Sequence, residues 1–172
     1  MKRSTDRILT TFVGSLARPP DLLEMMYAKE RGQPYDQEAY AGRVRRAVAD
    51  VVRQQVEAGV DIVCDGEQGK SGFFTYVSER LAGFEPRETT SPAGPWAGSR
   101  EALAFPEYYQ WYARGRPGSV AAPFGMVCTG PITYVGQQQV QTDIDNLKAA
   151  LKAFAPPGPG TEQPKAGAPA RP

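Results

Sequence analysis

The chain contains no histidine among its 172 residues, and it has only two cysteines. Histidine is the commonest general base and the commonest zinc ligand, so any chemistry here has to do without imidazole or borrow it from elsewhere. Cys64 and Cys128 are far apart and follow neither a disulfide-scaffold pattern nor a Cys-x-x-Cys spacing. This favours two free, buried thiols.

Excess charge and long apolar runs are also missing. Twenty Lys and Arg residues face nineteen Asp and Glu residues, which leaves a net charge of +1 and no general field for nucleic acid or an anionic membrane. No apolar run approaches the roughly 18 to 20 residues needed to span a bilayer, and the N-terminus offers no uninterrupted signal-peptide core. We therefore expect a cytoplasmic protein.

Composition divides the chain into two parts. Apolar residues make up 41% of the sequence, enough for one domain with a core, which we expect over residues 1–155. Residues 156–172, PPGPGTEQPKAGAPARP, contain almost nothing that could be buried. This segment is predicted to be a disordered Pro/Gly/Ala-rich tail.

Three short apolar segments are predicted to be strands, and each ends in a polar, glycine-containing turn. They are residues 8–13 before Gly14-Ser15, residues 60–64 before Asp65-Gly66-Glu67, and residues 124–128 before Thr129-Gly130-Pro131. Helices are expected over residues 21–30, 37–58, 71–81, 106–113 and 143–154. Asp36 is expected to cap the second, Gly83 to close the third, and Thr142 with Asp145 to form a capping box at the start of the last. Residues 85–106 are expected to form a loop.

Each predicted strand leads through a turn into a helix, and repeated units of this kind predict a parallel α/β protein. A complete (β/α)8 barrel usually needs about 250 residues, more than this chain has. The sequence therefore predicts either a smaller open α/β sheet or the leading portion of a barrel.

Two of the turns carry groups suited to binding. A bare backbone at Gly14 lets a ligand approach closely, and the amide and hydroxyl of Ser15 can bind a carboxylate. An ionised Glu67 can pair with an ammonium group. The alternatives are an ordinary strand-ending turn at Gly14-Ser15 and a Glu67 that caps the following helix. Arg18 either reaches an anionic group at the mouth or is a solvated surface arginine.

Three stretches of the sequence resemble a known family. They are TTFVGSLARPPDLL, VRQQVEAGVDIVCDGEQGKSGFFTYVSERLAGFE and VCTGPITYVGQQQVQTDIDNLKAAL. In this order they resemble the first half of the cobalamin-independent methionine synthase family, in particular its short, single-barrel members. The resemblance covers about residues 8 to 154.

This resemblance implies part of a (β/α)8 barrel, open rather than closed. It also implies a zinc-dependent methyl transfer from methyltetrahydrofolate, in its polyglutamate form, to the thiol of homocysteine. By position, Val13, Gly14 and Ser15 resemble the loop that holds the amino-acid end of the thiol substrate. Glu67 resembles the glutamate that accepts from its ammonium group, and Arg100 weakly resembles a folate-contacting arginine.

The family's zinc ligands, a histidine, two cysteines and a glutamate, come from later strands, so we expect no zinc site in this chain and no methylation by the chain alone. Phe12 stands where a histidine is frequent in the short members. The tail is interpreted as replacing barrel sequence, as a truncation or a shifted reading frame would. The alternatives are a non-catalytic fragment or small-molecule binding module that self-associates through open barrel edges, and a relative of the zinc-dependent enzymes that alkylate coenzyme M.

Overall fold

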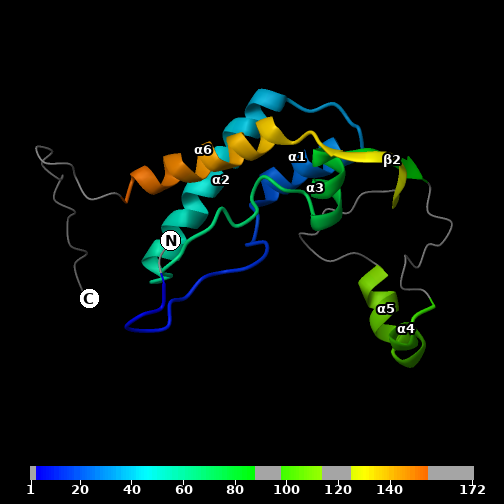
Figure 1. Ribbon diagram of the computed structural model, residues 1–172, viewed down its shortest axis with the longest axis horizontal. Helices are drawn as coiled ribbons and strands as arrows, with labels where there is room; N and C mark the ends of the chain where they lie inside the picture. Colours follow the sequence, from blue (N-terminus) through cyan, green and yellow to red (C-terminus); the bar gives the residue numbers. More distant parts are fainter. Residues whose placement is uncertain (1–2, 88–97, 114–124, 155–172) are drawn as a thin grey trace, which may run out of the picture.

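The computed structural model describes residues 3–87, 98–113 and 125–154 (Figure 1). The predicted tail, Phe124 and residues 88–97 of the expected loop lie outside the described residues. The elements are α1 (Pro20–Glu30), α2 (Gln37–Glu57), α3 (Phe73–Arg80), β1 (Leu81–Arg87), α4 (Arg100–Ala104), α5 (Pro106–Ala113), β2 (Gly125–Tyr134) and α6 (Gln137–Lys152). None of the helices in these ranges is long and apolar enough to cross a membrane.

Helices α1 and α2 are confirmed almost as the sequence predicts them. Pro20 stands at the first position of α1, where its missing N–H costs no hydrogen bond. Asp36 caps α2 by accepting a hydrogen bond of 2.9 Å from the Ala39 amide. Gly59 follows α2 with a φ of +78°, a conformation that glycine adopts without a side-chain penalty. The two helices therefore have their ends encoded locally.

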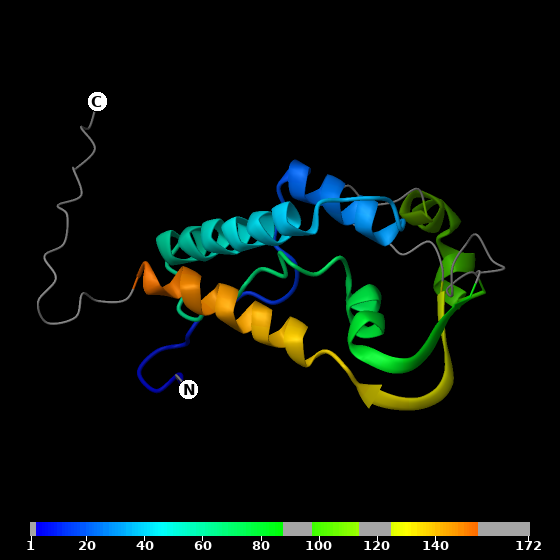
Figure 2. The same cartoon turned by 90° about the horizontal axis from the view of Figure 1, so that it is seen from above.

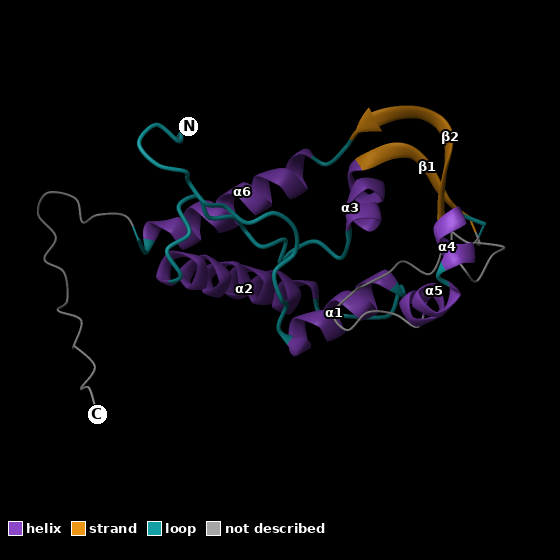
Figure 3. Cartoon of the chain, turned by 90° about the horizontal axis from the view of Figure 1, so that it is seen from below, coloured by secondary structure: helices purple, strands orange, loops and turns teal. Residues whose placement is uncertain are grey.

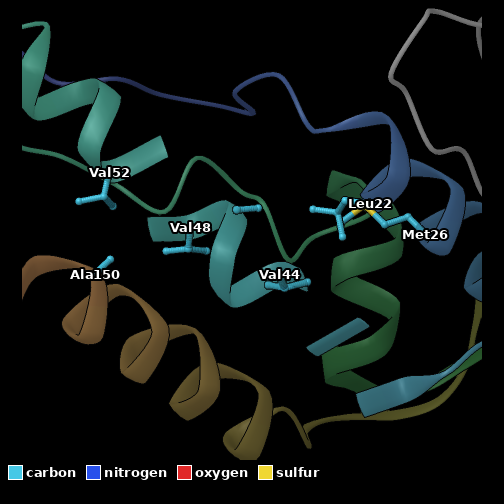
Figure 4. Packing of buried hydrophobic residues seen from close by; sticks show 7 residues of the cluster. Leu22, Met26, Val44, Val48, Val52 and Ala150 are labelled. Carbon is cyan, nitrogen blue, oxygen red and sulfur yellow. The ribbon is translucent and has the colours of Figure 1, made fainter. Parts of the chain in front are cut away.

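The core lies along α2, which has α1 on one side and α6 on the other (Figure 2). The valines of α2 supply most of it because they recur every three to four residues and so share one face of the helix. Figure 4 shows these side chains between the helices. The core cluster consists of Leu22, Met26, Val44, Ala47, Val48, Val52 and Ala150.

The first two predicted strands run parallel, but they form a bridge rather than regular strands. Thr11 and Ile62 form a single parallel bridge, and the Ile62 amide donates to the Thr10 carbonyl at 3.1 Å. The prediction of strands over residues 8–13 and 60–64 is therefore wrong in extent. The Asp61 carboxylate accepts from the Thr10 amide at 2.9 Å, so a side chain takes a donor that a longer ladder would use.

The third predicted strand is present, but its partner, direction and length differ from the prediction. It continues through Thr129-Gly130-Pro131, so the prediction of a turn at these residues is wrong. β2 pairs antiparallel with β1, from Leu81 opposite Tyr134 to Arg87 opposite Gly125 (Figure 3). β1 occupies residues that were expected to close a helix and begin a loop. The described part of the chain is thus a mixed helix and strand structure with an open two-stranded sheet, compatible with part of an α/β barrel domain.

Gly83 does not end a helix but sits at an irregularity in β1, where the register shifts between Ala82 and Phe84. Its φ is +93°, and a Cβ at this position would lie 2.5 Å from the Pro131 carbonyl oxygen. Only glycine fits such a close approach of two backbones. A glycine that in the sequence indicates the end of a helix therefore permits the close pairing of two strands here.

Helix α6 begins at Gln137, six residues earlier than the first residue, Asp143, that the capping box predicts. Thr142 lies inside the helix, and its hydroxyl donates to the Gln138 carbonyl at 3.0 Å. A threonine within a helix commonly bonds back to the preceding turn in this way. The capping-box prediction is therefore wrong, whereas the expected helix itself is confirmed.

Candidate functional site

Two turns lie side by side where the bridged segments end. The Leu16 amide in the first turn donates to the Gly66 carbonyl in the second at 3.0 Å. Gly14, Gly66 and Glu67 all have positive φ, of +99°, +60° and +55°. Such a φ is uncommon for a residue with a side chain, and its cost is borne by the surrounding contacts. Glycine adopts a positive φ freely, so this cost falls on Glu67, and the strained backbone is that of the second turn.

The structure brings Ser15 and Glu67 together across these turns. The Ser15 hydroxyl donates to Oε2 of Glu67 at 2.6 Å. Glu67 is half-buried and Ser15 is exposed, so the pair lies at the surface of the molecule. A Cβ built on Gly14 would meet nothing within 4 Å, which leaves its backbone open to approach.

The alternative that Glu67 caps the following helix is wrong for α3. That helix has Gly72 at its N-cap and receives no side-chain capping bond there. The Glu67 carboxylate is instead held by the serine of the other turn. It therefore faces the neighbouring turn rather than the helix.

The second turn is braced by its own polar side chains. Asp65 accepts from the Glu67 amide at 3.0 Å and pairs with Lys70 at 2.9 Å. Burial opposes the charge on Lys70, but the hydrogen bond and charge of Asp65 outweigh it and raise the pKa of Lys70. Gln68 is fully buried and donates to the Leu16 carbonyl at 3.2 Å. The 65–70 turn is thus fixed both internally and to the first turn.

Arg18 contacts both turns, and the interpretation of it as a solvated surface arginine is wrong. Its Nη2 lies 3.3 Å from the Ser15 hydroxyl, 3.1 Å from the Glu67 carbonyl and 2.6 Å from the Lys70 carbonyl. Burial lowers its pKa, and the nearby charge of Glu67 only partly opposes this. The sequence does not reveal this role, because two of the three partners of Arg18 belong to a distant segment.

The other two predicted site residues are not part of this contact. Val13 precedes Gly14 and its side chain is 88% exposed. Arg100 is the first residue of α4, where Ser99 provides the cap by accepting from the Ala102 amide at 3.1 Å. Helix α4 lies apart from the two turns in Figures 1 and 2. The structure therefore joins Ser15 to Glu67 but not to Arg100.

The described residues hold no group of three His, Cys, Asp or Glu side chains that could bind a metal ion. Cys64 and Cys128 are both free, as predicted. The expectation that both are buried is wrong: Cys64 is half-buried, with its sulfur 3.5 Å from Oε1 of Gln55, and Cys128 is exposed. The donor set of the described residues therefore does not fit the zinc that the family resemblance implies.

A family model described as the catalytic domain of cobalamin-independent synthase matches residues 8–155. The chain belongs to this family. The match includes both turns and runs through α6, so the Ser15 and Glu67 contact lies within the shared catalytic domain.

Curated relatives carry names that agree with the family. The chain is 37% identical over 76 residues to a methionine synthase of Thermococcus kodakarensis, covering 44% of this chain and 22% of the relative. It is 28% identical over 145 residues to a 5-methyltetrahydropteroyltriglutamate–homocysteine methyltransferase of Nitratidesulfovibrio vulgaris, covering 78% and 18%. A relative of the same name from Thermotoga petrophila is 26% identical over 155 residues, covering 83% and 20%. The chain spans about a fifth of the length of these relatives.

Proposed function

We propose that this chain provides the amino-acid-binding part of a methyltransferase that acts in methionine biosynthesis, transferring a methyl group from 5-methyltetrahydropteroyltriglutamate to homocysteine. Membership of the family supports the reaction class. The observation that carries the site is the 2.6 Å hydrogen bond between Ser15 and Glu67. It joins, across two turns, the two groups that the family resemblance assigns to one ligand.

The proposed architecture is the first portion of a (β/α)8 barrel. Its support is the parallel bridge between Thr11 and Ile62, after which both segments turn at the same edge. In such barrels the binding groups lie in the loops that follow the strands. The two turns would then form part of the barrel mouth.

In this proposal the zwitterionic end of homocysteine binds between the turns. The Glu67 carboxylate accepts hydrogen bonds from the ammonium group, and a charge-assisted bond of this kind is stronger than a neutral one. The open backbone after Val13, at Gly14, together with the amide and hydroxyl of Ser15, receives the carboxylate. The thiol is thereby oriented by its far end, which leaves the sulfur free for reaction.

The carboxylate of Glu67 also favours homocysteine over coenzyme M as the thiol. Coenzyme M carries a sulfonate and has no ammonium group, so it would bring a second negative charge toward Glu67. Like charges in a half-buried site repel. A zinc-dependent alkyl transfer to coenzyme M is therefore the weaker candidate.

The described residues supply binding and orientation of the thiol substrate rather than its activation. Zinc would activate the thiol in this family, but the described donors do not gather to hold it, so no step of the proposal passes through the metal. Arg100, as the candidate folate contact, rests on the family resemblance alone. The non-catalytic binding module makes the same prediction for homocysteine binding and differs by giving no methyl transfer.

Calorimetric titration of the purified chain with homocysteine tests the site. Glu67→Gln is expected to weaken binding about 10- to 100-fold, since a hydrogen bond to a charged group is worth about 1.5 to 3 kcal/mol. Glu79→Gln is the matched control, because Glu79 is also paired, at 2.6 Å with Lys29, but lies on α3. The control should bind homocysteine as the parent does.

Two results would remove the proposed site. One is an affinity for homocysteine that Glu67→Gln leaves unchanged, and the other is tighter binding of coenzyme M than of homocysteine. Methyl transfer is checked separately, with labelled methyltetrahydropteroyltriglutamate and added zinc. The chain alone is expected to bind homocysteine without transferring the methyl group, because its described residues do not gather zinc donors. Transfer by the parent would show that the chain also activates the thiol and would exclude the non-catalytic module.

A further inference from the structure

Arg18 is the side chain that connects the two turns of the candidate site. All its hydrogen bonds in the described structure come from Nη2, which reaches the hydroxyl of Ser15 and the carbonyls of Glu67 and Lys70. An arginine Nη carries two hydrogens, so two of these three hydrogen bonds share one hydrogen. Two of the three acceptors belong to the strained second turn, which contains the positive φ of Glu67.

The chemistry of these groups fixes the direction of each hydrogen bond. A guanidinium group has only donors, and a serine hydroxyl has one proton and two acceptor lone pairs. Ser15 therefore accepts from Arg18 and gives its single proton to Oε2 of Glu67. One carboxylate oxygen is thereby engaged. The other, Oε1, accepts no hydrogen bond from the described residues and can accept one from the ammonium group of a ligand.

Loss of Arg18 would remove a hydrogen-bond donor from Ser15 and from the 65–70 turn at the same time. The Ser15 hydroxyl could then turn and donate elsewhere, and the carbonyls of Glu67 and Lys70 would lose a charged donor. Because Arg18 is half-buried, these carbonyls would not gain full contact with water in exchange. The carboxylate would remain, but in a broader range of orientations.

We propose that Arg18 is a positioning residue of the amino-acid site: it orients the Ser15 hydroxyl and the 65–70 turn so that Glu67 presents a fixed carboxylate oxygen to an ammonium group. This rests on the proposed function above. It assigns to Arg18 a part in selecting thiols that carry an amine, and it adds a residue to those that the sequence assigned to the site.

The test compares homocysteine with 4-mercaptobutanoate, which keeps the thiol and carboxylate but lacks the amine. In calorimetric titrations, Arg18→Gln is expected to reduce the preference for homocysteine about 10-fold, the size of one charge-assisted hydrogen bond. Arg18→Lys, which keeps a cationic donor, should restore most of it. A role confined to stability would weaken both ligands alike and leave the preference unchanged.

Arg43→Gln is the control for a lost arginine. Arg43 joins α2 to α1 through two bonds to Asp21, of 2.6 and 2.9 Å, and has no contact with the turns among the described residues. Its loss should lower the unfolding midpoint without altering the ligand preference. The proposal would be overturned if Arg18→Gln kept the parent's preference for homocysteine over 4-mercaptobutanoate. It would also be overturned if Arg43→Gln lost this preference to the same extent as Arg18→Gln.

A measurement without ligand separates this inference from the proposed function. Urea unfolding midpoints are compared for the parent, Arg18→Gln, Ser15→Ala and the double variant. Coupled residues give a double variant that is less destabilised than the sum of the single variants. Additive effects would overturn the positioning role, whereas coupling in a chain that binds no homocysteine would retain the contact and refute the ligand assignment.

Discussion

The layer formed by α1, α2 and α6 and the region formed by β1, β2, α4 and α5 differ in how they treat apolar side chains. Every buried hydrophobic residue of the described structure belongs to the first region. In the second, large apolar side chains are exposed, including Leu103, Phe105, Trp111 and Ile132. The helical layer thus buries a core within the chain, although Val56, Ile144 and Leu151 remain 37 to 39% exposed, whereas the hairpin region buries no hydrophobic residue among the described ones.

This contrast shows which part of the chain can hold the candidate site by itself. The two turns are attached to the helical layer, since a Cβ at Gly66 would lie 3.2 Å from Val51 of α2. They therefore rest on packed helices. Self-association was an expectation from the sequence, and we propose it here, because exposed apolar side chains such as those of the hairpin region are commonly covered by another molecule.

The largest expected effect separates the two regions by a pair of leucines. Leu22 of α1 has no exposed surface, whereas Leu103 of α4 is 73% exposed. Leu22→Ala should lower the free energy of unfolding by about 2 to 5 kcal/mol, because it removes packed methyl groups and leaves a cavity. Leu103→Ala should change it by less than about 0.5 kcal/mol. Urea unfolding followed by circular dichroism measures both.

The two leucine variants can also show that the helical layer and the hairpin region do not differ in burial. Equal losses of stability would mean that the hairpin region is covered in solution, by another copy of the chain or by another part of it. Repeating the Leu103→Ala measurement at several protein concentrations distinguishes these cases, since only cover by a second copy depends on concentration.

A smaller effect is expected where the two regions meet, at Arg80. Its side chain is only 7% exposed, pairs with Asp143 of α6 at 2.8 Å and stacks on Tyr76 with 4.1 Å from Cζ to the ring centroid. The Arg80 carbonyl also accepts from the Val135 amide just after β2, at 2.8 Å. Arg80→Met should destabilise the chain by about 3 kcal/mol, because it leaves Asp143 without its partner.

Two further variants sharpen the test of this junction. Arg53→Met removes an arginine whose bonds to Asp50 and Glu57 are exposed, and it should cost less than about 1 kcal/mol. Arg80→Met combined with Asp143→Leu should recover part of the loss, since no charge is then left unpaired. If Arg80→Met and Arg53→Met prove equally mild, the junction does not couple the hairpin to the helices.

The sequence predicted the helical layer well because its signals are local. The valine spacing of α2, the Asp36 cap and Gly59 all act within a few residues of where they stand. The two turns were predicted for the same reason. Their proximity followed from the parallel direction that two strand-to-turn passages share, and the bridge between Thr11 and Ile62 confirms that direction.

The hairpin and the role of Arg18 were not predicted because their causes are distant in sequence. β1 contains Gly83 and Pro86, which interrupt a strand pattern, and its pairing depends on residues 125–134. Arg18 bonds to carbonyls of the 65–70 turn, and backbone acceptors leave no mark in a sequence. Ser-x-x-Arg spacing after a strand was the available signal, and it does not by itself name the partners.

The smallest expected effect concerns the pH dependence of the bridge that aligns the two turns. The hydrogen bonds from Arg7 and from the amide and hydroxyl of Thr10 hold the pKa of Asp61 well below its ordinary value of 3.8. A carboxyl group whose pKa is lowered by folding stabilises the folded state above the unfolded pKa, and this stabilisation is lost as the pH falls toward the folded pKa. The parent should therefore lose stability below about pH 4 more steeply than Asp61→Asn.

Urea midpoints between pH 6 and pH 2 measure this difference. The variant Arg7→Gln separates the contribution of the Arg7 cation from that of the Thr10 hydrogen bonds. Arg7→Gln keeps both Thr10 bonds and removes the cation, so its profile should lie between those of the parent and Asp61→Asn. Added salt should move the parent toward Arg7→Gln, because salt screens the exposed ion pair more than the Thr10 bonds. Parallel profiles for the parent and Asp61→Asn would show that the bridge contributes no pH-dependent stability, and the alignment of the turns would then depend on contacts such as those of Gln68 and Arg18.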